Sequence, residues 1–506
     1  MSRHEVPVFV EAPDDHVPRT AWALDTLLSV SGAHARVVRD RQRAGDCRLA
    51  YAPAPVAGLP TIPVSVRAVE LFRAGAALPA GSFEHYELLD ARCAGAFAVS
   101  LEDRSPQGFA IPFDAVASAF LLLAAWDEHT SGACDELGRF PYAASMFAQN
   151  PALELTDPAV DAYAAMVRQM VETRRPARGR RLRTGGAWGS AGFAVAATHD
   201  VDAVRRWTRQ GYRGALKRAA RGVLGGHRET WRPEMGAVLR GLAIHTPRGT
   251  DPYWTFPRLV DGEATRGARS TFFLLNEHTR ADDGGEPAEY ARLLPKLIRI
   301  VGAAGCEIGL HGSQRDTHDG RALGADRAGL AALAGAEITG VRYHYLRCLY
   351  HESLPLLDEA GFSYDSSIAC AELEGFRCGC SFPFHPYDLA RERPLGLLEM
   401  PLAVMDSTLQ EPRYRGLDPE AAFLAAAATL ERVRASGGAA AILWHQNRFD
   451  PYLGKGFGDV YWWLLDWIRD SGGKALPAGE AAAAWRNALG EPAPDGTPAA
   501  VRRWDA

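Results

Sequence analysis

The 506-residue sequence contains no long hydrophobic run, no strong excess of one charge and no clustered cysteines. Its most apolar stretch, residues 115–126, is far too short to span a bilayer. Lysine and arginine number 56 against 61 aspartate and glutamate, a formal net charge of −5. This balance, together with the lack of a recognised binding module, argues against a nucleic-acid partner. A hydrophobic share of 47% and a charged share of 23% exclude disorder, collagen and coiled coil as descriptions of the whole chain.

The N-terminus lacks a cationic head followed by an apolar run and a small-residue cleavage site, so we expect a cytoplasmic location. The eight cysteines are scattered, as is typical of reduced thiols. Cys378 and Cys380 form a C-x-C pair, but no second pair and no neighbouring histidine pair accompanies it. A zinc knuckle is therefore disfavoured.

The length predicts two or three domains, and two if one of them is a barrel. Within residues 1–172, the segments VPVFVEA and RLAYAP are predicted as short strands, and residues 115–128 and 158–172 as helices. No glycine loop that could cradle phosphate occurs there. We expect a small N-terminal α/β domain of unassigned role, followed by a basic linker at residues 173–190.

Residues 191–490 alternate short apolar strands with helical stretches. The predicted strands are FAVAATHD, STFFLL, CEIGLH, ITGVRYHY, FSYDSS, LLEMPLAVMD and AAAILWH. Repeated strand–helix units imply parallel strands with right-handed crossovers, so seven of them predict an α/β barrel or an incomplete one. Each strand ends on a polar residue, and in barrels such ends gather at the active site. These residues are Asp200, Asn276, His311, Arg342, Asp365, Asp406 and His445.

A basic segment at residues 203–248 interrupts the barrel pattern after the first strand. It carries many arginines but only two glutamates, and its apolar residues recur at helical spacing, which predicts amphipathic basic helices. A solvated insertion near the barrel mouth is one interpretation. The alternative is a surface that meets an anionic glycan, lipid or nucleic acid.

The first predicted strand ends in THDVD, residues 198–202, where Asp200 and Asp202 are spaced i, i+2. In an extended backbone both carboxylates face one side, and they repel each other unless a cation or a proton lies between them. A divalent metal could bind one and leave the other as a base. Capping of a following helix is the alternative for such aspartates.

Three further motifs carry candidate residues. EIGLHGSQRDTH places His311 at a strand end and His318 seven residues later, and two imidazoles with one carboxylate form the usual catalytic zinc arrangement. His445 in ILWHQNRFD could protonate a leaving group, because the pKa of histidine lies near working pH. Arg342 in GVRYHYLR could hold a catalytic carboxylate in its ionised form. Hydrogen-bonded structural histidines and a surface arginine are the alternatives.

In this order, THDVD, STFFLL, EIGLHGS, GVRYHYLR, YDSSI, MPLAVMD and LWHQNRF resemble the polysaccharide deacetylase superfamily, also called carbohydrate esterase family four. That group includes chitin, peptidoglycan and nodulation-factor deacetylases. The resemblance covers residues 193–471, and THDVD with HGS resembles a divergent bacterial branch associated with surface-polysaccharide gene clusters. AFLLLAAWDEH and GRFPYAASM resemble the domain that precedes such deacetylases.

The resemblance implies a distorted seven-stranded β/α barrel, a divalent metal, most often Zn²⁺, and hydrolysis of an N-acetyl amide on an amino sugar. It implies that Asp200 is the general base and that Asp202 and His311 are metal ligands. The family spaces its second pair of histidines i, i+4, but Arg315 stands four residues after His311 here. The third ligand is therefore left between His318 and His344.

The resemblance further implies that His445 is the general acid that protonates the departing amine. Arg342 would orient the base, and Asp365 or Asp406 would orient His445. Val201 between the two aspartates departs from the family, whose aspartates are adjacent.

The implied partner is an N-acetylated glycan or sugar precursor, which could be a polysaccharide, an oligosaccharide or a lipid-linked precursor. A lipid-linked or soluble precursor would fit a cytoplasmic enzyme, and the basic insertion could then contact anionic membrane lipids. The alternatives are an inactive glycan-binding or scaffolding relative, and an amidohydrolase that acts on an acylated small molecule.

Overall fold

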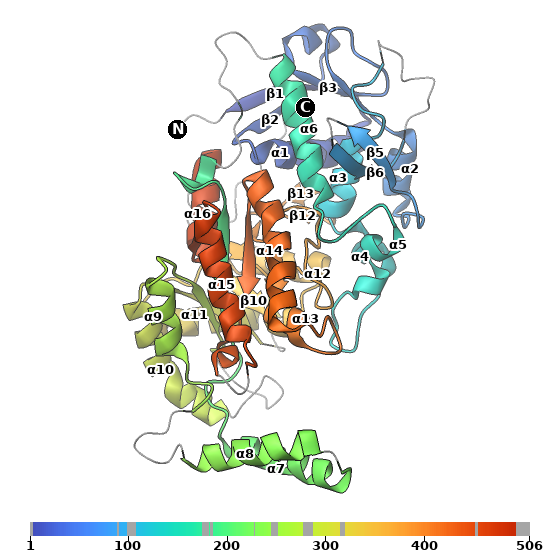
Figure 1. Cartoon of the computed structure of the whole chain (residues 1–506). Coiled ribbons are helices and arrows are strands. Elements are labelled where there is room, and N and C mark those ends of the chain that lie inside the picture. The colour runs from blue at the N-terminus through green and yellow to red at the C-terminus, as the bar shows by residue number, and fades with distance from the viewer. Residues whose placement is uncertain are drawn as a thin grey trace.

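The computed structural model shows two packed α/β regions (Figure 1). It describes residues 4–88, 91–98, 108–174, 182, 186–226, 228–243, 251–276, 287–313, 319–450 and 454–491. No helix among these residues is long and apolar enough to cross a membrane. The predicted linker at residues 173–190 lies largely outside the described residues, so its boundaries stay a prediction.

The N-terminal region is built on a parallel four-stranded sheet with the order β2-β1-β3-β4. Its strands are β1 (Glu5–Val10), β2 (His34–Val38), β3 (Leu49–Ala52) and β4 (Thr61–Pro63). The predicted strands VPVFVEA and RLAYAP are confirmed as β1 and β3. An antiparallel hairpin adds β5 (Glu84–Leu88) and β6 (Ala91–Gly95).

The helices of this region are α1 (Val17–Ser29), α2 (Val66–Ala74), α3 (Ala115–Leu123), α4 (Trp126–Ser131), α5 (Met146–Gln149) and α6 (Ala159–Thr173). The helix predicted at residues 158–172 is confirmed as α6. The prediction of one continuous helix at residues 115–128 is wrong, because Ala125 adopts a left-handed φ of 45° that separates α3 from α4. Asp114 caps α3 by accepting a hydrogen bond from the Ala117 amide at 2.9 Å.

The second region contains a parallel sheet with the order β14-β11-β10-β9-β8-β7-β16-β15, and β17 pairs with β7. Its strands are β7 (Ala194–Val201), β8 (Thr271–Leu274), β9 (Glu307–Gly312), β10 (Gly340–Tyr343), β11 (Tyr364–Asp365), β14 (Leu398–Glu399), β15 (Leu402–Met405), β16 (Ala439–Leu443) and β17 (Lys474–Leu476). All seven predicted strands are present in the expected order.

The sheet curls into a distorted barrel because its two edge strands are consecutive in the chain. Only Met400 and Pro401 separate β14 from β15. The Met400 amide donates to Asp365 on β11 at 2.9 Å, and the carbonyl of Pro401 accepts from Ala441 on β16 at 2.7 Å. Residues 398–405 thus act as one bent strand that joins both edges, which gives the expected seven-stranded barrel.

Amphipathic helices cover the outside of the barrel. They are α9 (Phe256–Ala264), α10 (Pro287–Ala303), α11 (Gly320–Ala334), α12 (Tyr350–Glu359), α14 (Pro419–Ser436), α15 (Phe457–Asp470) and α16 (Ala478–Leu489), with the short α13 (Asp406–Gln410) after β15. The helix α14 shows how their ends are specified. Asp418 caps it, Pro419 begins it, and Gly437 ends it with a left-handed φ of 70°.

The basic insertion forms two helices, α7 (Arg209–Leu224) and α8 (Arg228–Ala243), as predicted. Figure 1 shows them at the bottom of the molecule, away from the helices that cover the barrel. The chain enters α7 from the carboxyl end of β7, which places the pair on the side where the barrel strands end. A small antiparallel ladder of β12 (Tyr387–Asp388) and β13 (Arg393–Pro394) completes the described strands.

The two regions share one continuous hydrophobic core. Trp22 of α1 packs its ring near Tyr387 and donates its indole N–H to the carbonyl of His385 at 2.8 Å. Arg377, which is buried, pairs with Asp127 of α4 at 3.1 Å. The N-terminal region is therefore part of the body that supports the barrel.

Candidate metal and catalytic site

Four barrel strands deliver the candidate residues to one point at their carboxyl ends. Asp202 follows β7, His311 lies on β9, His344 follows β10, and His445 follows β16. In parallel strands these ends lie along the same rim, so residues far apart in the chain converge there. The sequence prediction that Asp202 and His311 meet in space agrees with their separation of 3.2 Å.

Among the described residues, Asp202, His311 and His344 form a group whose ligand atoms all lie within 4.8 Å of one another. One carboxylate oxygen of Asp202 lies 3.2 Å from Nε2 of His311 and 3.4 Å from Nε2 of His344. Both histidines are buried, whereas the Asp202 side chain is 32% exposed. This arrangement leaves one side of the group open to solvent.

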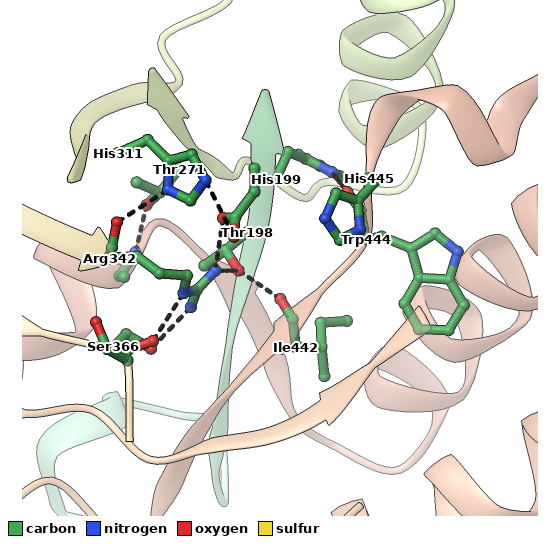
Figure 2. A network of polar contacts seen from close by, with 12 residues as sticks. Thr198, His199, Thr271, His311, Arg342, Ser366, Ile442, Trp444 and His445 are labelled. Carbon is green, nitrogen blue, oxygen red and sulfur yellow. Dashed lines mark hydrogen bonds and ion pairs between the residues drawn. The ribbon is translucent and has the colours of Figure 1, made fainter. Parts of the chain in front are cut away.

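His311 is held in the tautomer that a metal ligand needs. Its Nδ1–H donates to the backbone carbonyl of Arg342 at 2.9 Å, as Figure 2 shows, and its Nε2 is the ring nitrogen that faces Asp202. Such an outer hydrogen bond is the usual support of a metal-binding imidazole. The residues present therefore fit a divalent cation.

His344 sits on a strained turn, the 3-10 helix His344–Leu346. Tyr345 has a φ of 59° and stacks on the His344 ring with 3.9 Å between ring centroids. Arg139, from the N-terminal region, donates to the carbonyl of Tyr345 at 3.4 Å. Strained backbone of this kind persists only where surrounding contacts maintain it, and here it directs His344 toward Asp202.

Asp200 lies beside this group but has a different partner. Its carboxylate is buried and accepts a hydrogen bond from Arg342 at 3.1 Å, while its other oxygen lies 3.9 Å from His311. Arg342 also donates to Thr198 at 2.6 Å and to the carbonyl and hydroxyl of Ser366 at 2.7 and 2.8 Å. Figure 2 shows the guanidinium between these partners. The arginine therefore holds Asp200 in place, and its expected role in orienting a general base stays a prediction.

His445 lies on the opposite side of Asp202, with 3.7 Å between its Nε2 and the carboxylate. Its Nδ1–H donates to one oxygen of Asp406 at 2.7 Å, and the other oxygen accepts the His445 backbone N–H at 2.8 Å. Arg448 contacts the same carboxylate at 3.2 Å. Asp406 thus fixes the ring so that Nε2 faces the site.

Of the two carboxylates expected to orient His445, Asp406 does so, and the assignment of Asp365 is wrong. Asp365 accepts hydrogen bonds from the backbone N–H and the hydroxyl of Ser367 at 2.8 and 2.6 Å, and it shares a hydrogen bond with Glu399. The bent strand of β14 and β15 separates β11, which carries Asp365, from β16. Its carboxylate supports the loop after β11.

The charges around Asp202 and His445 shift the pKa values of these two side chains in opposite directions. Burial raises the pKa of Asp202, but the facing His344 and the neighbouring histidines lower it more, so it stays well below its usual range. Burial likewise lowers the pKa of His445, but Asp406 overcomes this and raises it to about 9. His445 is therefore protonated at neutral pH.

One predicted ligand, His318, lies outside the described residues, so the structure bears on His344 alone. In the sequence, His344 follows Arg342 by two residues, and no spacing motif there indicates that it is a metal ligand. His199, inside THDVD, is a structural histidine, since it contacts Glu263 at 2.8 Å and the carbonyl of Trp444 at 2.6 Å. Its neighbour Trp444 is buried beside it.

Comparisons with known proteins add the following findings. The model of DUF7033, a family of unknown function, matches residues 8–176. No curated protein matches the sequence. Among solved structures, a polysaccharide deacetylase described as putative from Mycobacterium smegmatis is 20% identical, with 59% of this chain and 91% of that chain covered and a TM-score of 0.38.

Two other solved structures are similar over the same share of the chain. A probable polysaccharide deacetylase from Pseudomonas aeruginosa PAO1 is 15% identical, with 59% of this chain and 92% of that chain covered and a TM-score of 0.39. Puue allantoinase is 14% identical, with 59% and 92% covered and a TM-score of 0.39.

Proposed function

We propose that this protein is a metal-dependent hydrolase that removes the N-acetyl group from an amino sugar, in a glycan or in a lipid-linked sugar precursor. The observation that supports the proposal most directly is that Asp202, His311 and His344 lie between a carboxylate and an imidazole that have different partners. Asp200 lies on one side of it, and His445 lies on the other.

The donor set favours Zn²⁺. Two imidazole nitrogens and one carboxylate oxygen are the ligands of many catalytic zinc sites, which keep one position open for water and substrate. A divalent cation held by these residues would supply Lewis acidity, which polarises an amide carbonyl and makes water a stronger nucleophile. The open side of the group is where the amide would enter.

Asp200 serves as the general base in this proposal. Arg342 and the buried surroundings fix its carboxylate, with one oxygen on the guanidinium and the other directed toward His311. The second oxygen can accept the proton of the attacking water. The two carboxylates of THDVD therefore have different roles in this proposal, since Asp202 would bind the cation and Asp200 would act as the base.

His445 serves as the general acid. Hydrolysis of an amide needs a proton on the departing nitrogen, since an amine anion is a poor leaving group. The pKa of about 9 keeps a proton on His445, and the Asp406 contact leaves Nε2–H as the donor that faces the site. After transfer, Asp406 still holds the neutral ring in place.

The rim of the site suits a sugar. Tyr345 is 39% exposed and stacks on His344, so an aromatic face borders the group. Arg139 contacts both the carbonyl of Tyr345 and the hydroxyl of Tyr414, at 3.4 and 3.3 Å. The N-terminal region thus reaches the edge of the site and can take part in binding a glycan.

The proposal is tested by metal content and acetate release. The full chain, purified without chelators, should carry about one zinc per chain and release acetate from N-acetylglucosamine oligomers. His344→Ala should lose most of the metal and the activity, since only two ligands remain. His129→Ala removes an exposed histidine outside the site and should retain both.

The outcomes separate the alternatives. Zinc bound equally by wild type, His344→Ala and His311→Ala would exclude this site. Bound zinc that the two variants lose, with no acetate from the oligomers but release from small acylated amines, would move the substrate to another amide. A chain that binds no metal but retains oligomers on a column would be a glycan-binding relative.

A further inference from the structure

We propose that the pair of helices α7 and α8, here called the basic hairpin, docks the protein onto an anionic lipid surface. The hairpin comprises residues 209–224 and 228–243. Its charge and its exposed apolar side chains are not used by the catalytic site. This docking does not depend on the reaction that the protein catalyses.

The two helices run antiparallel and pack through small residues. Arg218 pairs with Glu234 at 2.7 Å, and Ala215 lies in a cluster with Val238 and Trp207. Gly241 lies against Trp207 so closely that a side chain there would overlap the indole. One side of each helix is therefore already occupied by the other.

Each helix carries a second, exposed stripe at the spacing i, i+4, i+7, i+11, i+14. On α7 it consists of Arg209, Arg213, Leu216, Ala220 and Val223, and on α8 of Arg228, Arg232, Met235, Leu239 and Leu242. The apolar members are exposed to an unusual degree: 47% for Leu216, 56% for Val223, 62% for Leu239 and 56% for Leu242.

Both stripes lie on the same face of the hairpin. At about 100° per residue, each stripe is roughly a quarter-turn or slightly more from the packed side of its helix. Each stripe is displaced from the packed side in the same sense about its own helix axis. Because the two helices are antiparallel, both displacements lead to the same face of the hairpin. Arg218 and Glu234 lie on the other side of the packed seam, so their ion pair marks the opposite face. The shared face thus presents several leucine-sized side chains and four arginines.

The charge of the hairpin points to an anionic partner. Its two helices contain eight lysines and arginines against two glutamates, and Arg218 already engages Glu234. Within the described part of the chain, Arg209, Arg213 and Lys217 make no ion pair with an acidic side chain. A second copy of the same face would bring arginines against arginines, so self-association is disfavoured.

The apolar side chains distinguish lipid from other polyanions. A nucleic acid or an acidic peptide would neutralise the arginines but leave Val223, Leu239 and Leu242 in water. A membrane interface accepts both, since the apolar side chains enter the acyl boundary while the cations contact headgroups. We therefore assign this face to anionic phospholipid.

The connection between the basic hairpin and the barrel would orient the candidate site relative to the membrane. Asp251 accepts hydrogen bonds from the backbone N–H groups of Arg206 and Trp207 at 2.9 and 3.0 Å, which anchors the start of the hairpin. Asp202 precedes this anchor by only a few residues. Docking of the hairpin would therefore hold the carboxyl ends of the strands toward the membrane (Figure 1).

The test is sedimentation of the full chain with vesicles. Wild type should pellet with vesicles of equal parts phosphatidylglycerol and phosphatidylcholine, but not with phosphatidylcholine alone, and added salt should weaken binding. Arg209→Glu with Arg213→Glu should weaken binding at least about tenfold, because each cation near the surface contributes to the attraction. Leu239→Gln with Leu242→Gln should weaken it about tenfold as well.

The matched control is Arg299→Glu with Leu424→Gln, which changes one exposed arginine on α10 and one exposed leucine on α14. It should bind as wild type does. Failure of wild type to pellet with either vesicle, or equal weakening by the control, overturns the proposal. The proposal is also overturned if wild type forms a dimer that dissociates in the Leu239→Gln with Leu242→Gln variant. Binding to duplex DNA without binding to vesicles would overturn it as well.

Discussion

Arg342 shows how single residues set up this site. Its side chain has no exposed surface, and its guanidinium makes four hydrogen bonds. Besides Asp200, Thr198 and Ser366, the ring of Phe273 lies 4.6 Å from the guanidinium carbon. A buried cation is tolerated only with such compensation. The guanidinium held by these partners positions Asp200 beside the group of Asp202, His311 and His344.

Asp406 is expected to act as a positioning residue through His445. Asp406→Asn should lower kcat by roughly 10² to 10⁴-fold while KM and the zinc content stay near wild type, because the ring loses its orientation and its added basicity. Steady-state kinetics and metal analysis check this. Asp365→Asn serves as the comparison, since its carboxylate faces Ser367. A loss of zinc in Asp406→Asn would contradict the assignment.

At the scale of elements, glycines in the barrel strands let large side chains pass between neighbours. Gly309 faces the ring of Phe273, and Gly340 faces that of Tyr364. Because Gly340 has no side chain, Tyr364 of β11 crosses β10 and donates its hydroxyl to Glu307 of β9 at 3.0 Å. Three adjacent strands are thereby joined below the rim that carries the candidate site.

Gly340→Ala tests this contact. The added Cβ would lie 2.0 Å from the Tyr364 ring, so the ring must move, and we expect a loss of about 1–3 kcal/mol in the free energy of unfolding. Gly324→Ala is the control, since nothing lies within 4 Å of its Cβ position inside α11. That change should stabilise the protein by about 0.5–1 kcal/mol. Chemical denaturation of both variants measures the difference, and equal effects would contradict the close approach.

At the scale of the whole molecule, buried charges cross the boundary between the N-terminal region and the barrel. Arg377 follows the strand β11 and is 4% exposed, and its partners Asp127 and Glu128 come from α4 at 3.1 and 3.6 Å. Burial raises the pKa of Glu128 to about 7. Both acidic partners of the buried Arg377 therefore come from α4, which joins the N-terminal region to the barrel.

Asp127→Ala should cost about 3 kcal/mol of stability, at the lower end for a broken buried pair, because Glu128 remains as a second partner. Asp157→Ala breaks the half-exposed pair with Arg432 and should cost less than about 1 kcal/mol. Thermal unfolding of both variants decides the point. Similar small losses would mean that the Arg377–Asp127 pair contributes little to joining the two regions.

Local patterns were sufficient to predict the strands, the helices and the polar strand ends. Apolar segments that stop at Asp200, His311 and His445 mark buried parallel strands, because only such strands are hydrophobic throughout and polar at one end. The basic hairpin was likewise predicted from helical spacing and charge. The break at Ala125 was not, since a left-handed backbone at an alanine has no signal in the local sequence pattern.

Only the tertiary structure shows which further candidate residues lie beside Asp202 and His311. Asp365 and Asp406 each follow a strand in the sequence and are equivalent in pattern, but β15 lies next to β16 in the barrel and β11 does not. His344 has no motif of its own and reaches Asp202 through a strained turn. Strand order and turn geometry depend on contacts between segments far apart in the chain, and spacing along one strand carries no information about them.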